Sequence, residues 1–205
     1  MKLERVCLNA VQWERIKSFG PGSELGLLIE RHGLFVAIRL NSLQLLKALL
    51  SGGASTNDNY KGITPLVLAS AIASAALVEI LLAFGVDIEA PTDSVQKGIF
   101  PGACTALIAA TIKGREDVVQ VLLQHGAVVD TKDTLGWTAL AHACARSHLG
   151  VDVVKILLAR GADPFAKTAQ LCTFAAVKFD KGSNPVMIAS ALGHQAALAA
   201  LLRSG

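Results

Sequence analysis

The sequence predicts an all-α solenoid of about five stacked repeats, each built from two short helices and an extended, hairpin-like finger. A phrase of two leucines, two variable residues and a glycine recurs along the chain and ends at Gly53, Gly85, Gly126, Gly161 and Gly205. A second phrase, Thr-Pro-Leu or Thr-Ala-Leu, lies upstream of three of these endings and begins at Thr64, Thr105 and Thr138. Because the two phrases recur in register, we expect a repeated structural unit rather than one globular core.

The first 32 residues do not match the repeat, and we expect them to form an N-terminal helical cap. Apolar residues from Leu3 to Ile16 follow helical spacing, and Gly20-Pro21-Gly22 ends that helix. Ser23-Glu24 is the expected start of a second helix. A separate docking helix anchored by Trp13 is the alternative role. The segment has no apolar core typical of a signal peptide.

The residues from Lys61 to Ala90 illustrate one repeat. Thr64 is suited to cap a helix, and Pro65 fits its first turn, where no amide donor is needed. A break near Ala73-Ser74 separates this helix from a second one, which Gly85 ends in a left-handed conformation. Each helix is too short to persist alone in water, so neighbouring repeats must cover its apolar face.

This pattern resembles the ankyrin-repeat family, through Gly62-Ile63-Thr64-Pro65-Leu66, Gly136-Trp137-Thr138-Ala139-Leu140 and the endings at Gly126-Ala127 and Gly161-Ala162-Asp163. The resemblance covers roughly residues 30 to 205. The first and last repeats depart from it, with Gly33-Leu34-Phe35 and Asn184-Pro185-Val186 in place of Thr-Pro-Leu, and His142 lies one place later than the family's usual histidine. The expected boundaries are a cap at 1–32 and repeats at about 33–57, 58–90, 91–131, 132–166 and 167–205.

Two long insertions interrupt the repeat length, and they are expected to lengthen fingers on one edge of the solenoid. The glycine endings are 32 residues apart from Gly53 to Gly85, but 41 from Gly85 to Gly126 and 44 from Gly161 to Gly205. The extra residues fall in Pro91 to Gly102 and in Lys167 to Gly182. A shorter insertion of two residues lies near His148. Such insertions form loops that often carry the binding face.

Aromatic and lysine residues gather in these fingers, and aromatic side chains are common anchors at protein interfaces. We expect a partner to contact a set of finger residues together with helix positions that the family varies: Tyr60, Lys61, Ile72, Lys97, Phe100, Ile112, Lys113, Trp137, Arg146, Phe174 and Phe179. The alternative is structural, with Phe174 and Phe179 folding back to hold a long loop and Trp137 packing on its neighbour.

Composition and motifs point away from catalysis, cofactors and nucleic acid. The chain is 52% hydrophobic with a formal charge of +3, a balance that does not indicate nucleic-acid binding. His142, Cys144, His148 and Cys104 do not have the spacing of a metal site, and no phosphate loop or nucleophile–base motif is present. We therefore expect a non-enzyme without metal or cofactor. The resemblance also places Asn57 where the family sometimes carries a hydroxylated asparagine.

Cysteine spacing and hydropathy indicate in which compartment the protein is located and whether it spans a membrane. The four cysteines lack CxxC spacing, which favours a reducing compartment, the cytoplasm with the nucleus as second choice. Ile63 to Ala83 carries one charge, Glu79, over the length of a membrane span. Thr64-Pro65 opens that stretch like a repeat helix, so we expect buried helices and no membrane span.

The expected function is a non-catalytic interaction module, an adapter, scaffold, assembly chaperone or inhibitor, that binds a folded protein through its concave face and long fingers. The alternative is a regulatory ankyrin domain of a longer enzyme or channel. This alternative rests on Asn184 to Leu202, which carries no Asp, Glu, Lys or Arg although terminal repeats normally have a polar outer face. Self-association or a further domain would cover such an end.

Overall fold

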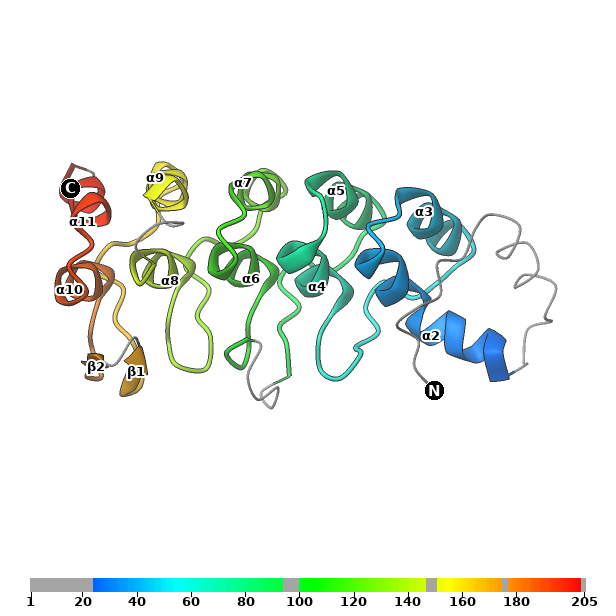
Figure 1. The fold of residues 1–205 in the computed structure, drawn as a ribbon, viewed down its shortest axis with the longest axis horizontal. Helices are drawn as coiled ribbons and strands as arrows, with labels where there is room; N and C mark the ends of the chain where they lie inside the picture. The colour runs from blue at the N-terminus through cyan, green and yellow to red at the C-terminus, as the bar shows by residue number, and fades with distance from the viewer. Residues whose placement is uncertain (1–23, 94–99, 147–150, 175–176, 204–205) are drawn as a thin grey trace.

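The computed structural model describes residues 24–93, 100–146, 151–174 and 177–203, and their helices stack in two layers (Figure 1). The inner layer contains α2 (Glu24–Arg39), α4 (Pro65–Ile72), α6 (Ala106–Ile112), α8 (Ala139–Cys144) and α10 (Pro185–Ala191). The outer layer contains α3 (Leu43–Ser51), α5 (Ala75–Ala83), α7 (Glu116–Gln124), α9 (Val151–Ala159) and α11 (Gln195–Arg203). The fingers project from the inner layer, all on the same side. The all-α repeat solenoid predicted from the sequence is confirmed.

Side-chain caps begin three of the inner helices, α4, α8 and α10, whereas Thr105 makes no such hydrogen bond at the start of α6. Thr64 Oγ1 accepts a hydrogen bond from the Val67 amide at 3.2 Å, and Thr138 Oγ1 accepts one from Ala141 at 3.3 Å. Asn184 does the same for α10, with Met187 as donor at 2.9 Å, although it replaces the threonine of the other repeats. A side-chain acceptor satisfies an amide that has no partner inside the helix, so each cap fixes where a repeat starts.

Small residues at the centre of the inner helices allow the repeats to stack closely. The residue five places after each cap position, or after the equivalent residue His32 inside α2, is alanine and is fully buried: Ala37, Ala69, Ala110, Ala143 and Ala189. The outer helices contribute the buried leucines Leu46, Leu77, Leu122 and Leu157 to the same continuous core. Each helix contacts its counterpart in the next repeat, as α4 with α6 and α7 with α9. Stability therefore depends on the neighbours, as stacking of short helices requires.

Side-chain acceptors at equivalent positions join successive repeats outside the core. Asn57 Oδ1 accepts from the Asp87 amide at 3.2 Å, Glu89 Oε1 from Val128 at 2.8 Å, and Asp130 from Asp163 at 3.2 Å. Each acceptor lies four residues after the glycine that ends an outer helix. At the next equivalent position the chain has Phe165, which is exposed and cannot accept. This series of hydrogen bonds thus stops at the last junction between repeats.

The second insertion forms a small β-hairpin. Strand β1 (Cys172–Phe174) pairs antiparallel with β2 (Val177–Phe179), and Cys172 lies opposite Phe179. The fingers also bond to one another through the backbone. The amide of Asp93 donates to Gly62 O at 2.8 Å, that of Thr134 to Gly102 O at 2.9 Å and that of Ala169 to Leu135 O at 3.0 Å. The fingers are therefore held to one another along the stack.

The N-terminal boundary differs from the expected one. Residue 32 was the expected end of the cap, but α2 begins at Glu24 and continues to Arg39 without interruption. Ser23 lies outside the described residues, and Gly33 lies inside the helix and neither caps nor stops it. An isolated glycine is tolerated inside a helix. None of the helices in the described ranges combines the length and apolar character needed to cross a bilayer.

Candidate protein-binding surface

One side-chain position lines the inner layer in every repeat, eight residues after the cap position. Its occupants are Leu40, Ile72, Lys113, Arg146 and Leu192, and we call them the groove row. Leu40 is 43% exposed and Ile72 49%, Lys113 is exposed, and Arg146 and Leu192 are half-buried. Each lies at the C-terminal end of its inner helix or just beyond it. Ile112, next to Lys113, is half-buried against the core. The row is apolar, apolar, basic, basic and apolar in chain order.

Tyr60 and Lys61 add a finger surface beside the first members of this row. The Tyr60 ring lies 4.6 Å from the His32 ring and 5.4 Å from the Phe35 ring, so two residues of α2 hold it in place. The Lys61 ammonium lies 5.3 Å from the centre of the Tyr60 ring. Both side chains are exposed. They are therefore accessible from solvent, and their contact with a partner stays a prediction.

Three expected contact residues are instead in the core, which corrects that part of the expectation. Trp137 is 1% exposed, Phe100 8% and Phe179 4%. The β-hairpin packs Phe174 and Phe179 against Trp137, with ring centres 6.1 and 6.0 Å away. Phe174 is half-buried in the same cluster. These aromatic side chains are used to build the core and not to anchor a partner. For Trp137, Phe174 and Phe179 the alternative stated from the sequence therefore holds, in which the loop folds back and its rings pack together. Lys97 and His148 lie outside the described residues, as does Trp13.

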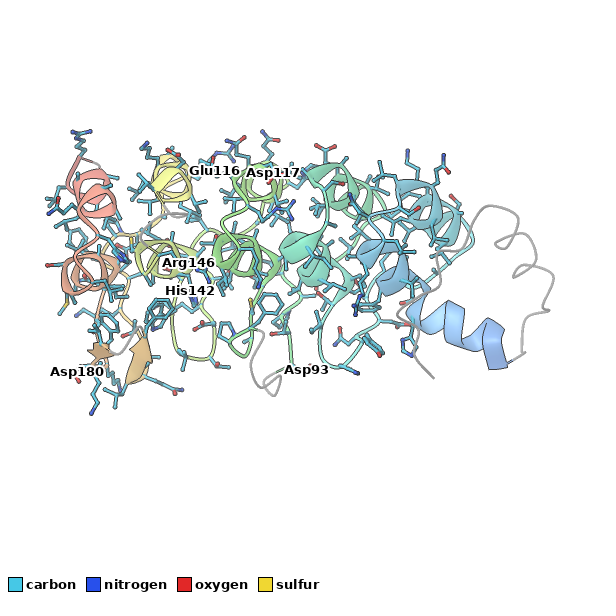
Figure 2. All side chains as sticks on the ribbon, in the orientation of Figure 1. Asp93, Glu116, Asp117, His142, Arg146 and Asp180 are labelled. Carbon is cyan, nitrogen blue, oxygen red and sulfur yellow. The ribbon has the colours of Figure 1, made fainter. Side chains whose placement is uncertain are left out.

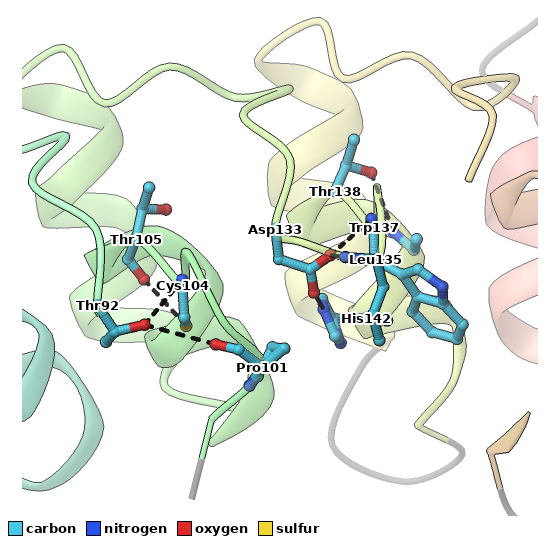
Figure 3. Close-up of polar contacts among 10 residues, drawn as sticks. Thr92, Pro101, Cys104, Thr105, Asp133, Leu135, Trp137, Thr138 and His142 are labelled. Carbon is cyan, nitrogen blue, oxygen red and sulfur yellow. Dashed lines mark hydrogen bonds and ion pairs between the residues drawn. The ribbon is translucent and has the colours of Figure 1, made fainter. Parts of the chain in front are cut away.

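Phe100 nevertheless contributes to the surface indirectly. Its ring lies beneath Lys113, whose ammonium is 5.7 Å from the ring centre. A cation over an aromatic face is held electrostatically. Two hydrogen bonds join the ends of the first insertion, which contains Phe100. The amide of Thr92 donates to Cys104 O at 2.9 Å, and the amide of Cys104 donates to Thr92 Oγ1 at 3.0 Å (Figure 3). Phe100 thus orients a groove-row lysine from below.

A buried acid organises the finger that precedes α8. Asp133 Oδ1 accepts from the amides of Leu135 and Trp137, both at 2.9 Å, and its Oδ2 lies 2.8 Å from His142 Nε2 (Figure 3). The Asp133 side chain is fully buried. His142 is therefore a hydrogen-bond partner of Asp133. The shifted position of His142 is visible in the sequence, but its contact with Asp133 is not.

The cysteines behave as core residues. Burial raises the pKa of the Cys144 thiol to about 12, and it raises the pKa of Cys104 still more, with the Asp133 carboxylate adding to the effect. Burial also raises the pKa of Cys172, and Asp133 adds to this, whereas the nearby Trp137 indole lowers it. The described residues contain no group of three His, Cys, Asp or Glu side chains that could hold a metal ion.

Charges divide between the two layers. Among the side chains that the structure describes, those of the inner helices and fingers include the cations Arg39, Lys61, Lys113, Lys132, Arg146, Lys167, Lys178 and Lys181 and fewer acids, which are Asp58, Asp93, Asp133 and Asp180. The outer helices and the turns beside them carry an excess of acids, Glu79, Asp87, Glu89, Glu116, Asp117, Asp130, Asp152 and Asp163, over the cations Lys47, Arg115, Lys155, Arg160 and Arg203. Glu116 and Asp117 extend from the outer layer, while Arg146 and His142 lie on the inner one (Figure 2). The face with the groove row is thus the more basic one.

The C-terminal repeat exposes the side that other repeats hide. The second leucine of the repeated phrase packs under the next repeat at Leu123, which is 9% exposed, but Leu202 is 70% exposed. Three residues after the cap, Val67, Ile108 and Ala141 are buried, whereas Met187 is exposed. This stacking surface, Met187 and Leu202 with Leu198 between them in sequence, is apolar and uncovered by the described residues.

Comparison with known proteins agrees with the architecture. The family model for ankyrin repeats, which spans three copies, matches residues 34–133 and 78–168. Glycerophosphocholine phosphodiesterase GDE1 of Candida albicans is 33% identical over 129 residues, which is 61% of this chain and 10% of that protein. Ankyrin repeat domain-containing protein 63 of Homo sapiens is 40% identical over 90 residues, 44% of this chain and 20% of that protein. Ankyrin repeat and SAM domain-containing protein 6 of Mus musculus is 32% identical over 129 residues, 62% of this chain and 14% of that protein. The chain therefore spans a fifth or less of the length of these relatives.

Proposed function

The chain belongs to the ankyrin-repeat family, and from that premise we propose that it is a non-catalytic module that binds a folded protein through its inner face. Ankyrin repeats indicate a protein-interaction module. The observation that carries the proposal is the groove row, because Leu40 and Ile72 keep more than two fifths of their surface exposed beside buried neighbours. Exposed apolar side chains in a continuous row mark interaction sites more often than isolated ones do.

The finger surface extends this row toward the partner. Tyr60 and Lys61 stand beside the first inner helices and are held by contacts to α2. A rigid aromatic side chain loses little conformational freedom on binding, which is why tyrosine is common at interfaces. An adapter, scaffold, chaperone or inhibitor would use such a surface in the same way. The proposed location is the cytoplasm, or else the nucleus, because the four cysteines lack CxxC spacing.

Affinity capture from the native cell with a mass-spectrometric readout tests this function. The test variant is Leu40→Asp with Ile72→Asp, and the matched control is Phe84→Asp with Phe165→Asp, which exchanges two exposed apolar residues away from the groove row. Circular dichroism first establishes that all three proteins have the same helix content. A partner captured by wild type and control but lost by the test variant supports the proposal. Equal capture by all three contradicts binding at this face.

The exposed stacking surface of the last repeat favours a second candidate function, a regulatory ankyrin domain packed against another part of a longer enzyme or channel. The relative GDE1 is by its name a phosphodiesterase, and the chain matches only a tenth of it. The mass of the native gene product separates the two candidates. A product near 21.4 kDa counts against the second, and a much larger one supports it.

A further inference from the structure

We propose that the groove row recognises an extended acidic segment of a partner protein, with apolar residues facing Leu40 and Ile72 and carboxylates facing Lys113 and Arg146. The inference rests on the proposed function and adds the chemistry of the partner. It also fixes the order of apolar and acidic residues along the segment, because the apolar and basic members of the row lie in different repeats. Leu192 then receives an apolar residue beyond the carboxylates.

The two cations are available for a partner. Within the described residues, neither Lys113 nor Arg146 has a carboxylate within ion-pair distance. The nearby acid Asp133 is buried and bonded to His142 and to two amides. Arg146 is half-buried, and a partly desolvated guanidinium gains more from a carboxylate than a fully solvated one does. Arginine also binds carboxylates in a two-point geometry.

Helix stabilisation does not account for these charges by itself. A cation at a helix C-terminus interacts favourably with the helix dipole, and Lys113 and Arg146 follow α6 and α8. However, α4 ends at Ile72 and α10 is followed by Leu192, so the fold accepts an apolar residue at the same position. The helix ends also have other partners, since the Arg115 guanidinium donates to Ala73 O, and Cys144 O lies 2.8 Å from His194 Nδ1.

The cation pair belongs to a wider separation of charge. Basic residues predominate on the inner helices and fingers, and acidic residues predominate on the outer helices and their turns. An acidic segment is therefore attracted to the inner face and repelled by the outer one. Such complementarity raises the association rate and selects the orientation of the partner.

The dimensions of the stack set the length of the segment. Helices in contact have axes about 8–10 Å apart, so the row spans roughly 32–40 Å over its four junctions. An extended chain rises about 3.3 Å per residue, and about ten to twelve residues cover that distance. Lys113 and Arg146 are one repeat apart, which places the two carboxylates about three residues apart.

Selection from a library of random peptides of about twelve residues, displayed on beads against the immobilised chain, tests the proposal. The test variant is Lys113→Glu with Arg146→Glu. The matched control is Lys47→Glu with Arg160→Glu, which reverses two exposed outer-layer cations. We expect peptides with paired acidic residues beside apolar ones, binding the control like wild type and the test variant about tenfold more weakly, as loss of two ion pairs predicts. Peptides with Lys in place of the acids should regain affinity for the test variant.

Selected peptides without an excess of acidic residues, equal binding to wild type and the test variant, or no selected peptides would each overturn the proposal. An oligouridylate is passed over the same proteins, and its retention by wild type alone, without peptide binding, would assign the row to nucleic acid. Thermal melting distinguishes loss of recognition from loss of folding in the test variant. A destabilised variant would lose binding to every peptide, whether the peptide is charged or not. If selected peptides are apolar and still require Ile72, the proposed function stands and the acidic chemistry fails.

Discussion

His142 Nε2 lies 2.8 Å from Asp133 Oδ2, and this buried contact joins the finger before α8 to the helix itself. Asp133 Oδ1 accepts two amides of the same finger, so one carboxylate fixes both the turn and the start of the helix. The imidazole supplies a proton at Nε2 either as the neutral tautomer or as the cation. The two residues are only nine apart in the sequence, but their contact fixes the orientation of the finger relative to α8.

We expect Asp133→Ala to lower the free energy of unfolding by about 3 kcal/mol, because three donors to a buried carboxylate lose their acceptor. Urea denaturation measures the change. Asp180→Ala is the control, since Asp180 accepts hydrogen bonds through its backbone carbonyl and its side chain is exposed. A double-mutant cycle with His142→Ala should give a coupling of about 1–2 kcal/mol. Additive single effects would mean that the contact contributes nothing.

Gly136→Ala should destabilise the stack by about 2–3 kcal/mol. A Cβ at this position would lie 2.3 Å from the Ala169 amide nitrogen and 2.6 Å from the Ala169 Cβ, and φ is +77°. Gly126→Ala is the matched control, because φ is +89° there but no atom lies within 4 Å of the new carbon. The control should lose only about 1 kcal/mol, the cost of the left-handed backbone. Equal losses in chemical denaturation would contradict close packing of the two fingers.

The buried thiols should lower stability at alkaline pH. The pKa of Cys104 and Cys144 is raised in the folded protein, so above pH 9 the unfolded chain loses protons that the folded chain retains. Stability is unaffected below the unfolded pKa and should then fall with pH by up to about 1.4 kcal/mol per pH unit for each thiol. Urea denaturation from pH 8 to 11 of wild type and a Cys104→Ala, Cys144→Ala variant measures this. A slope that is the same in both proteins would contradict it.

Thiol labelling should separate the cysteines by access. In a Cys7→Ser background, Cys172 should react with a thiol reagent in the folded protein before Cys104 and Cys144 do, because it is half-buried and they are fully buried. Peptide mapping identifies the labelled residue. Labelling of Cys104 or Cys144 at the Cys172 rate would show that the repeats open more often than their burial implies.

The exposed stacking surface should promote self-association at high concentration. Met187→Asp with Leu202→Asp is expected to abolish concentration-dependent dimers in analytical ultracentrifugation, since it puts charge on the uncovered apolar side. Phe84→Asp is the control, as it removes an exposed aromatic residue elsewhere. A wild-type chain that remains monomeric at all concentrations would contradict association through this end.

Local signals in the sequence predicted the repeat well. Thr64 and Thr138 cap helices, and Gly85, Gly126 and Gly161 have the expected positive φ, because caps and left-handed glycines depend on a few adjacent residues. The groove row could also have been completed from the sequence. Leu40 and Leu192 lie eight residues after His32 and Asn184, but the usual threonine is absent from those two positions, so the register is harder to recognise in the terminal repeats.

The positions of the finger aromatics could not be predicted in the same way. Trp137 and Phe179 are 42 residues apart, and an insertion of that composition can fold onto its neighbour or extend toward a partner with equal local plausibility. Burial of both rings decides the matter in the structure. The choice depends on how two repeats pack, which is a property of their shapes and not of either segment alone.

The packing of Trp137 between Phe174 and Phe179 also bears on how this gene could be rearranged. A repeat array evolves by duplication and loss of whole units, which requires interchangeable junctions. The fourth and fifth repeats share an aromatic cluster to which both contribute. A crossover between them would leave Trp137 in one product without Phe174 and Phe179, and the two phenyl rings in the other product without the indole. These two repeats should therefore be inherited together, as one double-length module, and a chimaera that keeps them intact has the better chance of folding.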